Sequence, residues 1–339
     1  MTRRIRDFTT VLGILIALAL MASPGCSTSE NDRRSSGGTN GPYLGETPPG
    51  LTPRVFAPGL VSTGADELNS IFSPDGTEFV FSIKTPDRSH HTVLGMNRRD
   101  ESWTPPRVLS FSGRFSDADP AYGPGGDSLY FISRGPISKG DAAKEDWDIW
   151  VVERSEDGWG EPTHLDEPVN TDKLEVYPSL TRDGVLYFSS GRDGGHGQND
   201  LYRTRIVDGH YTEPENLGDA INSEHSEGDL FIAPDESYII FVSSRPEGHG
   251  RGDLYVSFRQ DDGSWTRARN MGEEINSPWL EYCPAVTPDG KYLFFTSYRH
   301  RRGDLPLTYE KIVLAYDRPQ GGLGDIYWVD AAIIEQLRD

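Results

Sequence analysis

A short turn motif recurs five times along the chain and constrains its fold more than any other feature. It reads Ser73-Pro74-Asp75-Gly76 at its first occurrence, and related segments lie at 123–126, 181–184, 234–235 and 287–290. Successive motifs are 50 to 58 residues apart, and each is followed by an apolar segment of strand length. A repeat of this length, rich in turn residues, fits a four-stranded blade of a β-propeller. Five motifs therefore predict an all-β fold with five such blades.

A second signal marks the third strand of the repeat. It begins with Asp followed by two apolar or aromatic residues, at Asp148, Asp200, Asp253 and Asp325. Hairpin-turn residues such as Asp157-Gly158 come next. An aromatic residue then marks a fourth strand, at Trp103, Trp159, Tyr211 and Trp265. Each repeat is thus predicted to be an antiparallel meander.

The order of the strands predicts how the ring of blades closes. The chain begins with a segment that fits a fourth strand, about Arg54 to Val61, and ends after a third strand, Ile326 to Val329. An N-terminal strand that completes the last blade removes exposed sheet edges. We therefore expect the N-terminal strand to pair within the fifth blade.

The fifth repeat contains a long insertion, His300 to Gly324. Two segments compete for its third strand, Arg302–Leu305 and Gly324–Tyr327, and Pro306 makes the first choice poorer because proline cannot donate to a sheet. Residues 308–316 have the pattern of a short helix.

Composition narrows the class of protein. The chain has 339 residues, 35% of them hydrophobic, which is enough to bury a large core. Its net charge of −20 argues against a nucleic-acid binder, because phosphate contacts need a basic surface. It contains neither a phosphate-binding loop nor a Gly-x-Ser-x-Gly elbow. We expect a monomeric propeller without a cofactor.

The first 50 residues differ from the rest. Three arginines, an apolar run from Val11 to Met21 and small residues up to Cys26 follow the order of an export signal, so residues 1–25 are predicted to be that signal. Residues 26–50 are rich in Ser, Gly, Asn and Pro and are predicted to be a flexible tether. Residues 51–339 are then a single propeller domain.

The segment Ala-Ser-Pro-Gly-Cys that ends at Cys26 resembles a bacterial lipoprotein cleavage box. The resemblance implies that Cys26 becomes a lipidated N-terminus and anchors the protein to a membrane. Ordinary signal-peptidase cleavage and an uncleaved anchor are the alternatives. Cys283 is the other cysteine, so acylation of Cys26 would exclude an intramolecular disulfide.

The repeat itself resembles a known one. Ser-Pro-Asp-Gly followed by Phe-Val-Phe-Ser, and Asp-Leu-Tyr-Val after a Gly-rich loop, are similar to the WD40-like PD40 repeat of TolB-type β-propellers of bacterial envelopes. The resemblance covers about Arg54 to Asp330. It does not extend to TolB itself, which has an N-terminal α/β domain and six blades. It implies an exported envelope protein, facing the periplasm or the cell exterior, that binds an envelope protein or glycan without being an enzyme.

A carboxylate stands eight residues before each turn Asp, or before the Gly125 that replaces it, and an arginine ends the second strand of four repeats. Together they are Glu67, Asp117, Glu175, Glu227, Glu281, Arg134, Arg192, Arg245 and Arg299. Because antiparallel neighbours bring these strand ends together, one face is predicted to carry a charged ring. The ring either pairs internally and fixes blade packing or forms a polar funnel that binds a ligand. Blade one departs from the pattern with Lys84, and if a ligand binds off-centre, this blade is where it is expected.

Positions two residues further along the first strand are not repeated: Asn69, Asp119, Tyr177, Asp229 and Cys283. Asp119 and Asp229 come from non-adjacent blades and are predicted to face each other across the channel. Paired carboxylates cleave glycosidic bonds, so a glycan-cleaving propeller is the alternative function, whereas capping or solvated channel residues are the structural alternative.

Three histidines, His196, His249 and His300, recur four residues before an Asp, so a shared zinc site and three exposed loop positions are the alternatives. Histidines beside glycine are commonly exposed, so no metal site is predicted.

Overall fold

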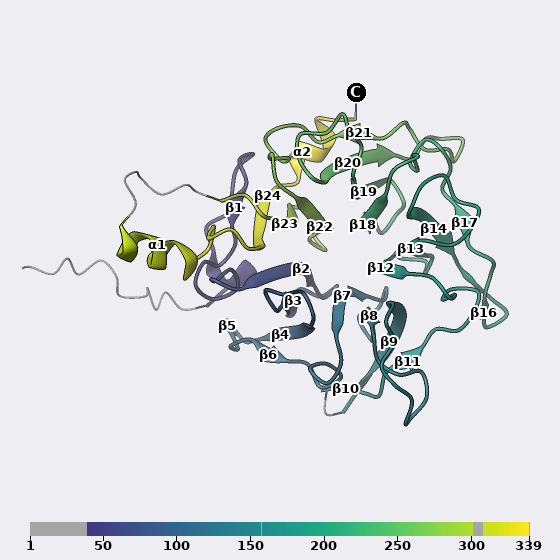
Figure 1. Ribbon diagram of the computed structural model, residues 1–339, viewed down its shortest axis with the longest axis horizontal. Helices are drawn as coiled ribbons and strands as arrows, with labels where there is room; N and C mark the ends of the chain where they lie inside the picture. Colours follow the sequence, from purple (N-terminus) through teal and green to yellow (C-terminus); the bar gives the residue numbers. More distant parts are fainter. Residues whose placement is uncertain (1–38, 157, 301–307, 339) are drawn as a thin grey trace, which may run out of the picture. The chain divides into compact units, whose positions relative to one another are not determined.

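The computed structural model describes residues 39–156, 158–300 and 308–338, and its strands form five antiparallel sheets of four or five strands and one short hairpin (Figure 1). The first strands of the five sheets neighbour one another in a closed ring. They are β2 (Asp66–Phe72), β7 (Asp117–Tyr122), β12 (Glu175–Leu180), β18 (Glu227–Ile232) and β22 (Glu281–Val286). The predicted all-β propeller with five blades is confirmed.

The second and third strands continue each meander away from the centre. The second strands are β3 (Glu78–Lys84), β8 (Ser128–Ser133), β13 (Leu186–Ser190), β19 (Tyr238–Ser243) and β23 (Tyr292–Ser297). The third strands are β4 (His91–Arg99), β9 (Asp148–Ser155), β14 (Asp200–Thr204), β20 (Asp253–Phe258) and β24 (Asp325–Asp330). The second strands read as continuous apolar runs because both of their faces are covered by neighbouring blades, as the full burial of Phe79 and Leu293 illustrates.

The outer edge of the blades differs from the prediction. The aromatic residues lie mostly on hairpins that prolong the third strands, namely β5 (Ser102–Trp103), β10 (Gly158–Trp159) and β16 (His210–Tyr211), the last paired with β15 (Ile206–Val207). Separate short strands then pair with the third strands: β6 (Arg107–Val108), β11 (Thr163–His164), β17 (Glu215–Asn216) and β21 (Arg269–Asn270). The predicted fourth strand is therefore two separate segments. The tryptophan is buried at the end of the blade, whereas a short strand further along the chain makes the hydrogen bonds that continue the sheet.

The ring closes as predicted, through an N-terminal strand in the fifth blade. Strand β1 (Arg54–Val55) pairs antiparallel with β24, although it is only two residues long instead of reaching Val61. The next residue, Phe56, has no exposed surface, and its ring lies 4.8 Å from that of Phe294 and 5.2 Å from that of Trp328. Closure thus rests more on this aromatic packing than on strand pairing.

The third strand of the fifth repeat is the later of the two candidate segments. Strand β24 begins at Asp325, and the alternative at 302–305 lies outside the described residues. The predicted helix is α1 (Tyr309–Tyr316), with the Thr308 hydroxyl accepting from the backbone N–H of Lys311 at its N-terminus. A second, short helix, α2 (Ala332–Glu335), ends the chain.

Part of the predicted tether packs on the propeller. Residues 42–45 form a 3-10 helix, Leu44 is buried, and the Tyr43 hydroxyl donates to Asp289 at 2.6 Å. The tether prediction for 26–50 is thus wrong from residue 39 onward, because Tyr43 and Leu44 join an aromatic cluster with Trp328. The export signal at 1–25 and Cys26 lie outside the described residues. Within the described ranges, no helix has the length and apolar character to cross a membrane.

Candidate functional site

The five repeated carboxylates lie at the start of the first strands, and all are buried: Glu67, Asp117, Glu175, Glu227 and Glu281. In blades three to five, each accepts hydrogen bonds from the backbone N–H and the hydroxyl of a Ser or Thr four residues earlier, and from a Ser hydroxyl at the end of the second strand. Around Glu227, Ser223 donates at 2.9 and 2.6 Å and Ser243 at 2.7 Å. These contacts tie the strand to the loop that enters the blade.

Three of the four predicted arginines complete the same arrangement. Arg192, Arg245 and Arg299 lie 3.4 or 3.5 Å from the carboxylates of their own blades. Each also donates to a backbone carbonyl of the preceding loop. The repeated groups therefore pair internally in blades three to five, and whether the face they border binds a ligand stays a prediction.

Blade two departs from this pairing. Arg134 donates to the carbonyl of Glu145 and lies over the Trp147 ring, so Asp117 receives only hydrogen bonds. Burial raises the pKa of Asp117 to about 6, although hydrogen bonds from Ser133 and Ser112 act in the opposite direction.

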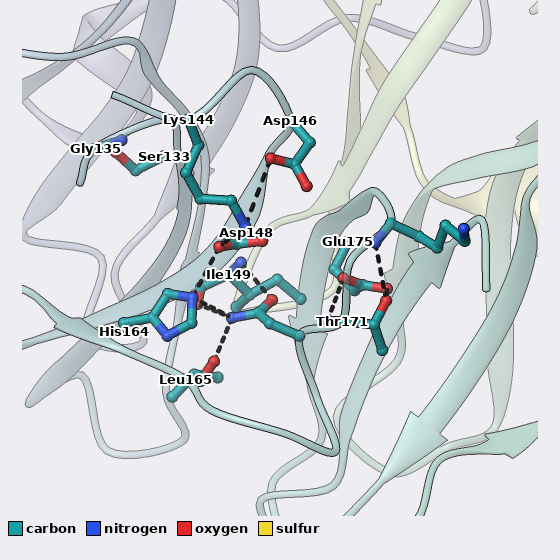
Figure 2. A network of polar contacts seen from close by, with 12 residues as sticks. Ser133, Gly135, Lys144, Asp146, Asp148, Ile149, His164, Leu165, Thr171 and Glu175 are labelled. Carbon is teal, nitrogen blue, oxygen red and sulfur yellow. Dashed lines mark hydrogen bonds and ion pairs between the residues drawn. The ribbon is translucent and has the colours of Figure 1, made fainter. Parts of the chain in front are cut away.

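The third-strand Asp of blade two lies in a network of titratable side chains (Figure 2). Asp148 accepts from Lys144 and lies 2.8 Å from Nε2 of His164. Burial acts to raise the pKa of Asp148, but the His164 and Lys144 contacts outweigh it and hold that pKa below its usual range. Neither Lys144 nor His164 was predicted. Lys144 has no sequence signal, whereas His164 precedes Asn170 by the six residues that separate Asn216 from Asn222.

In blades three and four, the equivalent Asp is capped by neutral groups instead. Asp200 accepts from Asn216 Nδ2 at 2.8 Å, and Asp253 accepts from Asn270 Nδ2 at 2.7 Å. Two backbone N–H groups of the preceding loop complete each set. The strand register places His164 at the same position as these two asparagines.

Blade five lacks this cap. The register places Val55 where the asparagines stand, so no side chain reaches Asp325 from β1. Oδ2 of Asp325 accepts from the backbone N–H of Gln320 at 2.7 Å, whereas Oδ1 has no hydrogen-bond partner and the residue is 2% exposed. Burial, reinforced by the charges of Glu67 and Asp66, raises the pKa of Asp325 to about 7.

The five unrepeated inner residues share one backbone conformation. Asn69, Asp119, Tyr177, Asp229 and Cys283 all have φ between 40° and 57°, and the ladder to the second strand shifts register at each of them. They are β-bulges, which bend the first strand and re-aim its side chains. Because the bulge occurs in every blade with different residues, the conformation belongs to the architecture and only the side chains are particular to each blade.

Asp119 and Asp229 are close enough at the centre for their charges to interact. Burial raises the pKa of both carboxyls, and the charge of Asp229 raises the pKa of Asp119 further. The Cys283 thiol donates to Asp229 Oδ1 at 3.1 Å. The side chains of Asp119 and Asp229 are only 3% and 6% exposed, so a glycan chain could reach them only through an opening that this conformation does not provide.

A pocket of ≈ 690 Å³ lies on the charged face, above blade five and its junction with blade one. Its aromatic side chains are Trp279, Tyr298 and Tyr316, and Asp66 and Asp325 also line it. The volume lies within the range of small-molecule sites, roughly 300–1,000 Å³. The pocket adjoins blade one, the blade whose charges depart from the repeat.

Lys84 replaces the repeated arginine beside this pocket. Its Nζ lies 2.9 Å from the Tyr282 hydroxyl and 3.7 Å from Asp66 Oδ1, and the Tyr298 hydroxyl donates to the same carboxylate at 2.9 Å. The N–H of Gly324 also donates to Asp66, and a Cβ at residue 324 would lie 2.7 Å from that oxygen, so glycine is required there. Asp66 is therefore fully committed to protein contacts.

Three arginines line the pocket and project into solvent: Arg88, Arg251 and Arg318. Among the described residues, none of the three forms an ion pair. Arg251 lies over the Trp279 ring at 5.6 Å and Arg88 over the Tyr298 ring at 5.7 Å, which orients two guanidiniums at the rim. No sequence motif marks these three arginines as a set, because they come from loops of blades one and four and from the insertion.

The histidines do not gather at a metal site. Across residues 39–156, 158–300 and 308–338, no group of three or more His, Cys, Asp or Glu side chains is arranged to hold a metal ion. His196 and His249 contribute backbone N–H groups to Asp200 and Asp253, while the His300 ring lies 4.6 Å from that of Trp279.

No protein-family model matches the chain, and no curated protein matches it either. Solved structures similar to it include an α-L-arabinofuranosidase from Lactobacillus brevis, with 11% identity over 79% of this chain and 91% of that chain and a TM-score of 0.46. An α-L-arabinofuranosidase from Podospora anserina is 10% identical over 83% and 94%, with a TM-score of 0.43. A puromycin-hydrolyzing peptidase from Mycobacterium tuberculosis is 14% identical over 80% and 44%, with a TM-score of 0.40. No activity is inferred from likenesses this distant, and the resemblance to PD40 repeats rests on the sequence motifs.

Proposed function

We propose that the chain is a non-enzymatic binding propeller of the bacterial cell envelope, which holds a protein or glycan ligand in the pocket between blades five and one. One observation carries the proposal. The repeated carboxylates in blades three to five are buried and paired with arginines, whereas Arg88, Arg251 and Arg318 are exposed around an open pocket and form no ion pair with any described residue. Unpaired cations and aromatic faces at a concave surface are typical of ligand sites.

Direct titration tests this proposal. The full chain is titrated with a panel of envelope glycans and peptides while tryptophan fluorescence is recorded, and Trp279→Phe identifies the signal from the pocket. We expect at least one panel member to bind, with an affinity reduced about tenfold by Arg251→Ala, which removes a charge-assisted contact. Arg182→Ala is the control, since Arg182 is exposed on a turn at the opposite end of blade three. If no panel member changes the pocket signal, or if Arg182→Ala weakens binding equally, the proposal is wrong.

The proposed location follows from the N-terminal sequence. We infer that residues 1–25 are removed on export and that Cys26 carries the lipid anchor, with the propeller as a monomer at the membrane surface. Labelling cells with a clickable fatty acid tests this inference. Incorporation that is lost in Cys26→Ser supports it, whereas an unlabelled protein of full length or one cleaved elsewhere contradicts it.

A second function is supported by Asp119 and Asp229, which meet at the centre with raised pKa values. One carboxyl that stays protonated beside one that ionises is the pairing a glycoside hydrolase needs, so we propose glycan cleavage as the alternative. Their burial argues for a structural role unless the centre opens. Incubation with a polysaccharide panel decides between the two. Sugars released by the wild type, but by neither Asp119→Asn nor Asp229→Asn, would establish the hydrolase and displace the non-enzymatic proposal.

A further inference from the structure

The pocket between blades five and one presents a local positive charge on an acidic protein. The chain as a whole carries a net charge of −20. Around this pocket, Arg88, Arg251 and Arg318 are exposed, and within the described part of the chain they have no carboxylate partner. Asp66 does not compensate them, because Lys84 and Tyr298 already engage it. The site therefore favours an anion that the rest of the surface repels.

The aromatic side chains offer flat faces beside these cations. Trp279 is half-buried, with Arg251 over its ring and His300 against it at 4.6 Å. Tyr298 is half-buried too, and Lys84 and Arg88 fix its ring at 5.3 and 5.7 Å. Rings held in this way do not need to be ordered on binding, and a sugar can pack its C–H groups against the exposed part of each ring beside the cations.

Asp325 supplies the third observation, and the repeat provides an internal control for it. The equivalent Asp200 and Asp253 each accept three hydrogen bonds, including one from an asparagine. Asp325 is 2% exposed and accepts one, leaving Oδ1 unpartnered at the pocket. An unpaired buried polar atom costs free energy, and this cost is explained when a ligand supplies the missing group.

We propose that the pocket binds an anionic oligosaccharide. Its acidic groups pair with the three arginines, its sugar faces lie on Trp279 and Tyr298, and one of its hydroxyls hydrogen-bonds Oδ1 of Asp325. An acidic peptide satisfies the arginines but brings neither the flat C–H faces nor the dense hydroxyl groups. The inference rests on the proposed binding function and names the ligand class of the same site.

Calorimetric titration of the full chain with four probes tests this inference. An alginate trisaccharide carries carboxylates, a chondroitin sulfate tetrasaccharide adds sulfates, mannotriose is the neutral counterpart, and a glutamate-rich hexapeptide is the acidic non-sugar. We expect at least one acidic sugar to bind about tenfold or more tightly than mannotriose and the peptide, with an affinity that falls as salt rises. The two acidic sugars distinguish carboxylate from sulfate as the recognised group.

Two variants test the role of Asp325. Asp325→Asn keeps the size of the side chain, but its one oxygen stays with the Gln320 N–H and an amide donor replaces the Oδ1 acceptor, whereas Val55→Asn supplies the asparagine cap found in blades three and four. Both are expected to weaken binding of the acidic sugar about tenfold, whereas Arg182→Ala leaves it unchanged. Val55→Asn keeps the test informative if Asp325→Asn fails to fold.

The outcomes separate this inference from the proposed function. Equal affinity for mannotriose, or tighter binding of the peptide, overturns the anionic oligosaccharide while a binding pocket survives. Unchanged affinity in folded Asp325→Asn and Val55→Asn overturns the contact with Asp325. Failure of all four probes overturns the inference alone if another member of the envelope panel binds at Trp279, and both proposals if none does.

Discussion

Replacing Glu227 by Ala tests whether the repeated carboxylates hold the blades together. Glu227 has no exposed surface, and its loss leaves one backbone N–H and one hydroxyl of Ser223, and the hydroxyl of Ser243, without their acceptor. It also leaves Arg245, whose Nε lies 3.5 Å away, without a counter-charge.

The expected loss of stability is large. An unsatisfied buried donor costs about 1–3 kcal/mol, but the two hydroxyls can rotate toward other acceptors, so the N–H and the arginine dominate. We expect Glu227→Ala to lower the free energy of unfolding by about 3–5 kcal/mol, the range seen when a buried ion pair loses one partner. For a domain of this size that corresponds to a fall in Tm of roughly 5–8 °C. Glu227→Gln, which keeps one oxygen acceptor, should lie between the variant and the wild type.

Urea unfolding followed by circular dichroism measures the difference. Glu224→Ala is the matched control, because Glu224 is three residues away and its side chain is 87% exposed. The control should stay within about 0.5 kcal/mol of the wild type. If Glu227→Ala unfolds at the same urea concentration as the control, the repeated carboxylates do not hold the blades and their burial needs another explanation.

Three further predictions address the centre, the insertion and the closure. Burial raises the folded-state pKa of Asp229 above its unfolded value near 4, so ionising Asp229 costs stability as pH rises. Between pH 4 and pH 8, the wild type should therefore lose about 1 kcal/mol or more of its free energy of unfolding relative to Asp229→Asn. Urea midpoints of the two proteins that change equally with pH would contradict this. Leu314→Lys on α1 should change the free energy of unfolding by less than about 0.5 kcal/mol, since the side chain is 64% exposed, and a larger loss in thermal unfolding would mean that α1 packs on the propeller. Phe56→Ala should cost about 3–5 kcal/mol in urea unfolding, because the ring is fully buried between blades five and one; a loss below about 1 kcal/mol would show that the N-terminal segment is not needed for closure.

The fold was predictable because its signals are local and repeated. A turn such as Ser73–Gly76 fixes where one strand ends and the next begins, and the absence of a fourth strand after Ile326 to Val329 required the N-terminal segment to supply it. The division of the fourth strand was missed. Trp103 and Trp159 mark buried positions, and burial alone does not say whether the backbone at that residue pairs with the third strand or leaves it.

The candidate site was less accessible to sequence reasoning. The prediction that Asp119 and Asp229 face each other came from equal positions in different blades, and the charge of Asp229 contributes to the raised pKa of Asp119. The pocket could not be predicted from the sequence, because Arg88, Arg251 and Arg318 occupy unrelated positions in their segments and come together only in the folded chain. The sequence holds a partial sign of the missing cap on Asp325. Asn216 and Asn270 stand six residues before Asn222 and Asn276, whereas the strand that pairs with β24 carries Val55 at the equivalent position.

Repetition makes each departure informative, because equivalent positions show what the architecture alone requires. At the centre, the equivalent positions carry a different side chain in different blades, yet Asp119, Asp229 and Cys283 are all buried there. The pocket departs in a different way: Asp325 loses the cap that Asp200 and Asp253 have, and it does so beside open volume. An asparagine at residue 55 would stand where Asn216 and Asn270 cap the carboxyls of blades three and four, so blade five lacks a cap that its fold could carry. Blade five is therefore where the ligand that we propose should be sought first.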